Sequence, residues 1–238
     1  MFFKKPKIKD LLPFPVEAPH AEYSMILSAE GDSPPSPKIL ESSLQAIQAA
    51  KEIDLSKISS RLEDSIDYLN LWPGEHYKLL AGFVKALKPK TIIEIGTATG
   101  LSALSMKSAL PANGKIYTFD PVGWESYEGA YLKEEDFSDG KLIQYTDNLA
   151  KPFFIEKYRA ILEKADLIFI DATHDGKLEE KLLENFQKIH FERPPLLILD
   201  DIRVWTMLRM WRKVKLPKLD LTSFGHWSGT GIIEWRRT

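Results

Sequence analysis

The sequence predicts an α/β fold: a doubly wound, seven-stranded, mostly parallel sheet with an antiparallel last strand, preceded by an N-terminal helical extension. Three observations carry this prediction. From residue 91 onward, short apolar runs alternate with helical patterns, which is typical of a parallel sheet covered on both faces. The run 196–199 is apolar throughout, as expected for a strand buried on both faces. The last two strand-like runs are joined too briefly for a crossover helix, so one of them should be antiparallel.

The elements follow from the period of the apolar residues, taken in chain order. Before residue 91, leucines and isoleucines at helical spacing predict helices over 38–52, 56–70 and 76–87. Short apolar, often β-branched runs predict strands at 91–95, 116–119, 141–145, 167–170, 196–199, 219–224 and 231–235. Helical spacing between these runs predicts helices at 101–110, 153–164, 178–189 and 202–214.

The chain divides into an extension, residues 1–72, and a Rossmann-like domain, residues 73–238. Seven of the 15 prolines lie in residues 1–37, so this stretch is expected to be an extended arm. The extension is interpreted as a lid or a dimer element, and residues 72–76, W-P-G-E-H, are the preferred lid or cofactor-closing element. A homodimer is therefore one expected assembly.

Composition excludes several classes of protein. Lys and Arg number 32 against 34 Asp and Glu, which argues against a nucleic-acid partner. The chain has no cysteine, which excludes disulfides, zinc–thiolate sites and a thiol nucleophile and fits a cytoplasmic location. No run of 18 apolar residues is present, so no membrane span is expected.

The sharpest motif is a glycine-rich turn between the first predicted strand of the domain and the helix after it. Residues 96–100 read G-T-A-T-G, and the next strand ends at Asp120, 20 residues after Gly100. An acid at this point of a doubly wound fold hydrogen-bonds ribose hydroxyls, so a nucleoside ligand is expected. The loop lacks the dinucleotide pattern G-x-G-x-x-G, and Glu94 just before it would repel a phosphate but suits an amino group. S-adenosylmethionine has an amino acid tail, a sulfonium and no phosphate.

Residues 93–102, I-E-I-G-T-A-T-G-L-S, resemble the first motif of the S-adenosylmethionine-dependent methyltransferases with the seven-stranded Rossmann-like fold. The likeness is greatest to small-molecule O-methyltransferases of the catechol and caffeoyl-CoA type and their bacterial relatives, and it covers about residues 73–238. It implies methyl transfer from S-adenosyl-L-methionine to a hydroxyl of a small molecule. The implied cofactor-binding residues are Glu94, Gly96, Thr97, Ala98, Thr99, Gly100, Ser102, Asp120, Asp147, Asn148 and Asp171.

Carboxylates also follow the fourth and fifth predicted strands of the domain. Asp171 ends one strand, and Asp200 and Asp201 end the next. Ligands of open α/β sheets bind outside the carboxyl ends of strands, so these side chains are expected to converge on Mg²⁺ or another divalent cation. In the family that the chain resembles, such a metal chelates the acceptor oxygen and lowers its pKa. The alternative is that one of the adjacent acids only caps the helix expected from residue 202.

His174 is the expected general base, with Asp171 as its catalytic partner. It stands three residues after Asp171, where the catechol-type family often has a lysine. Imidazole has a pKa near neutrality and can accept a hydroxyl proton. Two alternatives stay open: His174 makes only a turn contact with Asp171, or His226 in the last loop is the base. His20, His76 and His190 are expected to be ordinary surface or packed residues.

Two other functions remain compatible with the sequence. One keeps the cofactor but needs no metal, with the methyl group going to nitrogen or another acceptor. The other is a non-catalytic methyltransferase-like module that acts in dimerisation or scaffolding. The intact glycine loop with Asp120 favours the enzyme.

Overall fold

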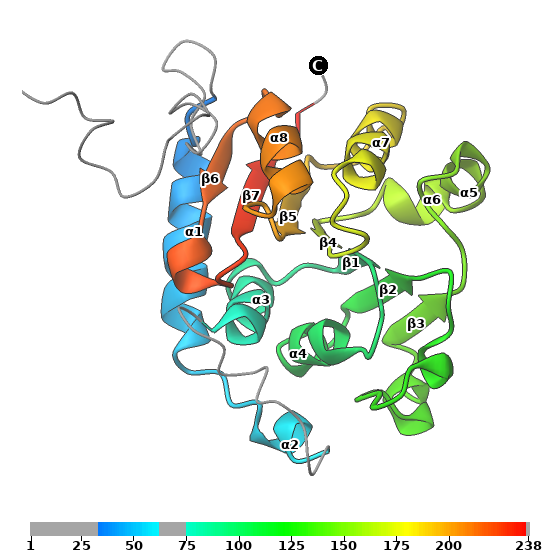
Figure 1. The fold of residues 1–238 in the computed structure, drawn as a ribbon. Helices are drawn as coiled ribbons and strands as arrows, with labels where there is room; N and C mark the ends of the chain where they lie inside the picture. Colours follow the sequence, from blue (N-terminus) through cyan, green and yellow to red (C-terminus); the bar gives the residue numbers. More distant parts are fainter. Residues whose placement is uncertain (1–32, 62–74, 237–238) are drawn as a thin grey trace, which may run out of the picture.

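The computed structural model describes residues 33–61 and 75–236. Its centre is a seven-stranded sheet of order β3-β2-β1-β4-β5-β7-β6 (Figure 1). The strands are β1 Thr91–Ile95, β2 Lys115–Phe119, β3 Leu142–Tyr145, β4 Leu167–Ile170, β5 Leu196–Asp200, β6 Lys218–Asp220 and β7 Thr230–Glu234. β7 is antiparallel to both of its neighbours, and the pairs among β1 to β5 are parallel. The predicted fold class is confirmed.

Helices cover both faces of this sheet (Figure 1). Successive residues of a strand point to opposite faces, so Ile92 belongs to one apolar core and Ile93 to the other. The first core lies under α1 Pro37–Ala50, α3 His76–Leu87 and α4 Leu101–Ser108. The second lies under α5 Pro152–Lys157, α6 Arg159–Leu162, α7 Lys177–Phe186 and α8 Trp205–Lys213.

Helix α1 of the extension is part of the first core. Its Ile39 and Ala46 are fully buried, and the helix packs along α3. A short helix, α2 Ser56–Ser59, follows. Within the described residues the chain also forms 3₁₀ turns at η4 Trp124–Ser126, η5 Glu134–Phe137 and η6 Thr222–Phe224.

Four predicted elements differ from those observed. The helix expected over 56–70 ends at Ser59, and residues 60 and 61 form a turn. The single helix expected over 153–164 is interrupted at Tyr158, whose φ of −104° and ψ of 12° leave the helical region. The helix expected from residue 202 begins at Trp205, because Asp201 has a φ of 57° and Val204 is extended. The strand expected over 219–224 ends at Asp220, whose carboxylate accepts the Thr222 N–H and turns the chain into η6.

Several predictions fall on residues outside those described. They concern most of the proline-rich arm, the helix predicted beyond residue 61, residues 72–74 of the predicted lid element and the boundary between residues 72 and 73. In the part of the chain that is described, no helix is long and apolar enough to cross a membrane.

Candidate active site

The loop after β1 leaves the sheet where the strand order reverses, between β1 and β4, which is the usual ligand position in doubly wound sheets. Gly96 has a φ of 102°, and a β-carbon there would lie 1.6 Å from the backbone carbonyl oxygen of Asp171. Gly100 has a φ of 84°, and a β-carbon there would lie 2.1 Å from Leu132 Cγ. Only glycine fits at either position, and the loop is held between two neighbouring segments.

Asp120, expected to bind ribose, fixes the shape of this loop. Its Oδ2 accepts the N–H groups of Thr97 at 3.1 Å and Ala98 at 3.0 Å, and its Oδ1 accepts that of Val122 at 2.9 Å. These bonds hold Ala98 at a φ of 42°, an uncommon conformation for a residue with a side chain. The Tyr127 hydroxyl also lies 3.4 Å from each carboxylate oxygen of Asp120. The contact of Asp120 with ribose stays a prediction.

Glu94 lies at the end of β1, fully buried. Its Oε1 accepts a 2.6 Å hydrogen bond from the Ser102 hydroxyl at the start of α4, and its Oε2 has no partner among the described residues. Burial raises the pKa of Glu94 to about 8, although the Ser102 bond opposes this. A buried acid with an unpartnered oxygen beside the loop fits a ligand that carries an amino group and a sulfonium.

Asp147 and Asn148, expected near adenine, are engaged in the turn after β3. Asp147 Oδ2 accepts hydrogen bonds from Lys157 Nζ and Tyr158 OH, each at 2.6 Å. Asn148 Oδ1 accepts the Ala150 N–H at 2.9 Å. The bonds fasten the turn to α5, and contact with adenine stays a prediction.

Asp201 is the centre of a polar cluster at the end of β5. His174 Nδ1 donates to its Oδ2 at 2.8 Å, and the Ser228 hydroxyl donates to its Oδ1. His226 Nδ1 lies 3.7 Å from the same Oδ1. Burial alone would raise the pKa of Asp201, but its bonds to His174, His226 and Ser228 hold it well below the usual range.

Neither Asp200 nor Asp201 caps α8, so the capping alternative is wrong. The N-cap of α8 is Val204, and no side chain caps that helix end. Asp200 is buried, and its Oδ1 has no hydrogen-bond partner among the described residues. Burial and then the adjacent negative charge of Asp201 raise the pKa of Asp200 to about 7.

His76, the last residue of the predicted lid element, lies at the site, whereas its side chain was expected to be an ordinary surface or packed residue. It stands at the start of α3, fully enclosed, with Nδ1 3.8 Å from Asp200 Oδ1 and 3.4 Å from Thr230 Oγ1. Its Nε2 has no partner among the described residues, and burial lowers its pKa to about 4. The expectation of an ordinary packed histidine misses its position because only the tertiary fold brings α3 to the end of β5.

His174 is held by its backbone as well as by its ring. Its φ of 54° is strained for a residue with a side chain. Its N–H donates to Glu179 Oε1 at 3.2 Å, and its carbonyl accepts a hydrogen bond from the Thr206 hydroxyl at 3.0 Å. The bond to Asp201 occupies Nδ1 and leaves Nε2 3.6 Å from Asp171 Oδ1. That bond raises the pKa of His174 to about 9, whereas burial opposes it.

The carboxylates predicted to bind a metal are only partly gathered. Among the described residues, one ligand atom each of Asp200, Asp201 and His226 lie within 4.8 Å of one another. Asp171 is outside this set and faces His174; burial, followed by the charge of Asp200, raises its pKa to about 7. The donors are two carboxylates and an imidazole, and one of these carboxylates, Asp200, has an oxygen without a hydrogen-bond partner among the described residues. This set fits a divalent cation that accepts both oxygen and nitrogen ligands.

Comparison with known proteins agrees with this fold. Residues 93–202 match the family model described as "Methyltransferase domain". A solved structure of the SAH-bound methyltransferase PaMTH1 from Podospora anserina superposes with a TM-score of 0.53, 15% identity and coverage of 87% of this chain and 92% of that one. The chain has the S-adenosylmethionine-dependent methyltransferase fold. A methyltransferase from Geobacter sulfurreducens gives a TM-score of 0.52 at 13% identity, over 78% of this chain and 98% of that one.

Two sequence relatives of this methyltransferase-fold chain carry more specific names. Catechol O-methyltransferase from Niastella koreensis is 30% identical over 161 residues, which are 62% of this chain and 64% of the relative. Tricin synthase 1 from Oryza sativa subsp. japonica is 34% identical over 118 residues, 45% of each chain. The chain spans about half the length of the plant relatives it matches.

Proposed function

We propose that the protein transfers a methyl group from S-adenosylmethionine to a hydroxyl of a small molecule. The observation that carries the proposal is that the loop after β1 contacts the end of β4 at one edge of the sheet. The glycine loop that would hold the cofactor lies against the carbonyl of Asp171, and His174 lies three residues further on. The names of the sequence relatives, catechol and caffeoyl-CoA O-methyltransferases, support a hydroxyl acceptor.

His174 has the geometry of the base. Asp201 accepts the Nδ1–H, so the neutral ring would carry its lone pair on Nε2, which would take the acceptor's hydroxyl proton. Asp171, opposite Nε2, would stabilise the imidazolium that results. When bound, S-adenosylmethionine would supply a methyl group already activated by the sulfonium, with the neutral thioether as the leaving group. The loop and His174 therefore act chiefly by alignment.

Asp200, Asp201 and His226 would hold a divalent cation. Such a cation would polarise the acceptor oxygen and, by its charge, favour the neutral form of His174. Without it, the raised pKa of His174 leaves the ring protonated at neutral pH. Mg²⁺ is the expected metal, as in the sequence prediction, and Mn²⁺ suits the imidazole ligand better.

A metal-independent methyltransferase is the second candidate. Asp201 already accepts bonds from His174 and Ser228, and Asp171 is not in the metal cluster. In this case the acids would serve only to orient the two histidines. A cytoplasmic location stays a prediction in either case.

Methyl transfer from labelled S-adenosylmethionine to a panel of catechols, other phenols and sugar hydroxyls tests the proposal. The assay is run on the full chain, first as purified, then after EDTA treatment, and then with Mg²⁺ or Mn²⁺ restored. We expect transfer to at least one hydroxyl acceptor that is lost with EDTA and regained with metal. Transfer that EDTA does not change would support the second candidate, and transfer only to amines would contradict the hydroxyl acceptor.

A further inference from the structure

Arg61 joins the N-terminal extension to the segment between β2 and β3. Its Nη1 and Nη2 donate to Asp136 Oδ2 at 2.6 Å and Asp136 Oδ1 at 2.9 Å, and Nη1 also donates to the Tyr131 carbonyl at 2.9 Å. The side chains of Arg61 and Asp136 are only 19% and 9% exposed. A bidentate pair shielded to this degree is stronger and more directional than a surface ion pair.

The backbone of Tyr131 links Arg61 to the glycine loop through two hydrogen bonds. Its carbonyl accepts from Arg61, and its N–H donates to the Thr99 carbonyl at 2.8 Å. The next residue, Leu132, donates to the same carbonyl at 3.3 Å and fills the space beside Gly100. Arg61 is therefore two hydrogen bonds away from the loop that would hold the cofactor.

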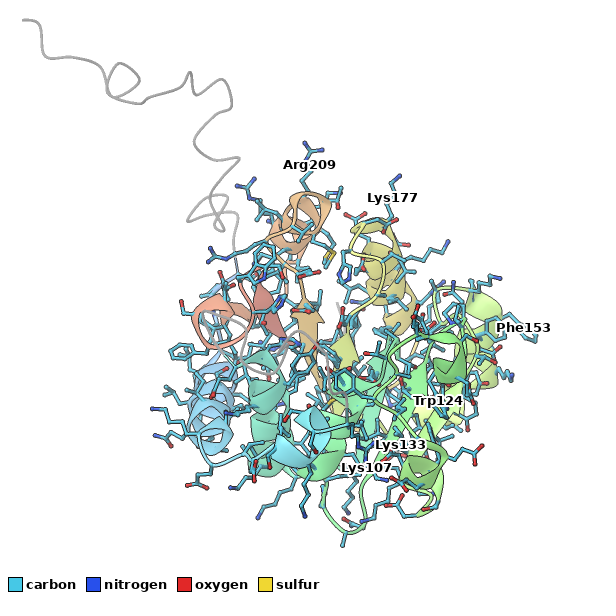
Figure 2. All side chains as sticks on the ribbon, turned by 60° about the horizontal axis from the view of Figure 1, so that its bottom comes forward. Lys107, Trp124, Lys133, Phe153, Lys177 and Arg209 are labelled. Atoms are coloured by element: carbon cyan, nitrogen blue, oxygen red, sulfur yellow. The ribbon has the colours of Figure 1, made fainter. Side chains whose placement is uncertain are left out.

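Asp136 fixes the same segment from its other end. Its Oδ2 accepts the Lys133 N–H at 2.9 Å at the start of η5, and Lys107 from α4 donates to its carbonyl oxygen. Lys107 and Lys133 are labelled in Figure 2, which looks onto this region. Burial would raise the pKa of Asp136, but Arg61, Lys133 and Lys107 hold it below its usual range. Loss of the guanidinium would leave this carboxylate without its main counter-charge and release residues 131–137 from the extension.

We propose that Arg61 is a positioning residue that sets the affinity of the glycine loop for S-adenosylmethionine, and thereby couples the N-terminal extension to cofactor binding. The inference rests on the proposed function. Coupling between a remote contact and a binding site is typically worth about 5- to 150-fold in affinity. Because only two hydrogen bonds separate Arg61 from the loop, we expect an effect of roughly 10-fold.

The test compares Arg61→Ala, Arg61→Lys and wild type by two measurements on the full chain. Calorimetry gives the dissociation constant of S-adenosylhomocysteine, and hydrogen exchange without ligand follows the Tyr131 and Leu132 amides. Arg61→Ala should weaken binding about 10-fold and speed the exchange of both amides. Arg61→Lys keeps the charge but lacks the planar guanidinium. Its dissociation constant and its exchange rates should therefore lie between those of Arg61→Ala and wild type.

Lys85→Ala is the matched control. It removes a 2.7 Å ion pair with Glu52, which joins the stretch after α1 to α3 but has no contact with the glycine loop. Its affinity and its exchange at residues 131–132 should equal those of wild type.

The outcomes separate this inference from the function on which it rests. A wild type that does not bind S-adenosylhomocysteine overturns the proposed function and this inference with it. A wild type that binds, beside a folded Arg61→Ala that binds equally well, overturns the inference alone. An equal loss of affinity for S-adenosylhomocysteine in Lys85→Ala would also overturn the inference alone. If Arg61→Ala does not fold, Arg61→Lys decides: wild-type affinity and exchange in that variant would contradict the positioning role.

Discussion

Gly96 lies directly against the backbone of Asp171, so closely that a β-carbon on residue 96 would be 1.6 Å from the Asp171 carbonyl oxygen. The Asp171 N–H also donates to the Ile95 carbonyl at 2.9 Å. The end of β1, with the loop proposed to hold the cofactor, and the end of β4, with the proposed base nearby, are thus in direct contact. Any change at residue 96 should therefore affect both parts.

Gly96→Ala should abolish binding of S-adenosylhomocysteine. The methyl group has no room beside Asp171, and the φ of 102° is strained for alanine, so we expect a loss of affinity of at least about 100-fold and destabilisation of roughly 1–3 kcal/mol. Calorimetry and thermal unfolding measure the two effects. Gly140→Ala is the control, because residue 140 has a φ of 67° but nothing within 4 Å of its β-carbon. The two variants should differ in affinity, and equal affinity would contradict the role of the close contact.

Glu94→Gln should remove part of the pH dependence of stability. Folding raises the pKa of Glu94 from 4.5 to about 8, so the folded protein holds this proton more tightly than the unfolded chain. The contribution of Glu94 to the free energy of unfolding therefore falls as pH rises between these values, by about 1.4 kcal/mol per pH unit, and does not change below or above them. Urea unfolding from pH 4 to 9 measures the slope. The free energy of unfolding should depend less steeply on pH in Glu94→Gln than in wild type. Substitution of an exposed residue, Glu128→Gln, should leave the slope unchanged. Parallel curves for wild type and Glu94→Gln would show that Glu94 ionises normally in the fold.

Asp200→Asn should abolish stabilisation by divalent cations. The Asp200 Oδ1 has no protein partner among the described residues and belongs to the only metal-competent cluster found there. Wild type should melt at a higher temperature with Mg²⁺ or Mn²⁺ than with EDTA, because a ligand that binds only the folded state stabilises it. Asp200→Asn should melt at the same temperature in both. Glu180→Gln, in an exposed pair with Lys213, should respond like wild type. A metal response retained by Asp200→Asn would rule this cluster out as the binding site.

His174→Ala should lower kcat by about 10²- to 10⁴-fold, the usual contribution of a general base. The side chain touches Asp171 and Asp201 but not the glycine loop in the described contacts, so the affinity for S-adenosylhomocysteine should stay within a few-fold of wild type. Exposed His190→Ala should leave both quantities unchanged. The same measurements on His226→Ala test the alternative base. Because His226 is also a proposed metal ligand, a loss of kcat there does not by itself identify the base. Wild-type kcat in His174→Ala, beside a loss in His226→Ala, would make His226 the base.

The sheet and the glycine loop could be predicted because both depend on patterns of neighbouring residues. Runs of β-branched residues indicate the strands. Because the carboxyl ends of parallel strands lie at one edge of a sheet, the order of the residues was enough to predict that the loop and the acids after β4 and β5 lie at the same edge. Glycine at residues 96 and 100 likewise follows from the turn that a strand-to-helix loop requires.

The parts that could not be predicted depend on contacts between distant segments. His76 reaches Asp200 only because α3 begins beside β7. Arg61 reaches Asp136 only because the extension folds back onto the segment between β2 and β3. The start of α8 was misplaced because apolar spacing includes Ile202, whereas the backbone of Asp201 turns away to bring its carboxylate to His174.

Titration of S-adenosylhomocysteine into the purified protein, in buffer with Mg²⁺, tests the central claim most directly. The geometry of the Gly96 loop, Asp120 and Glu94 predicts one binding site of micromolar affinity per chain. Absence of heat, together with absence of binding by a second method such as equilibrium dialysis, would contradict the claim. The methyltransferase fold would then serve a non-catalytic role in this protein.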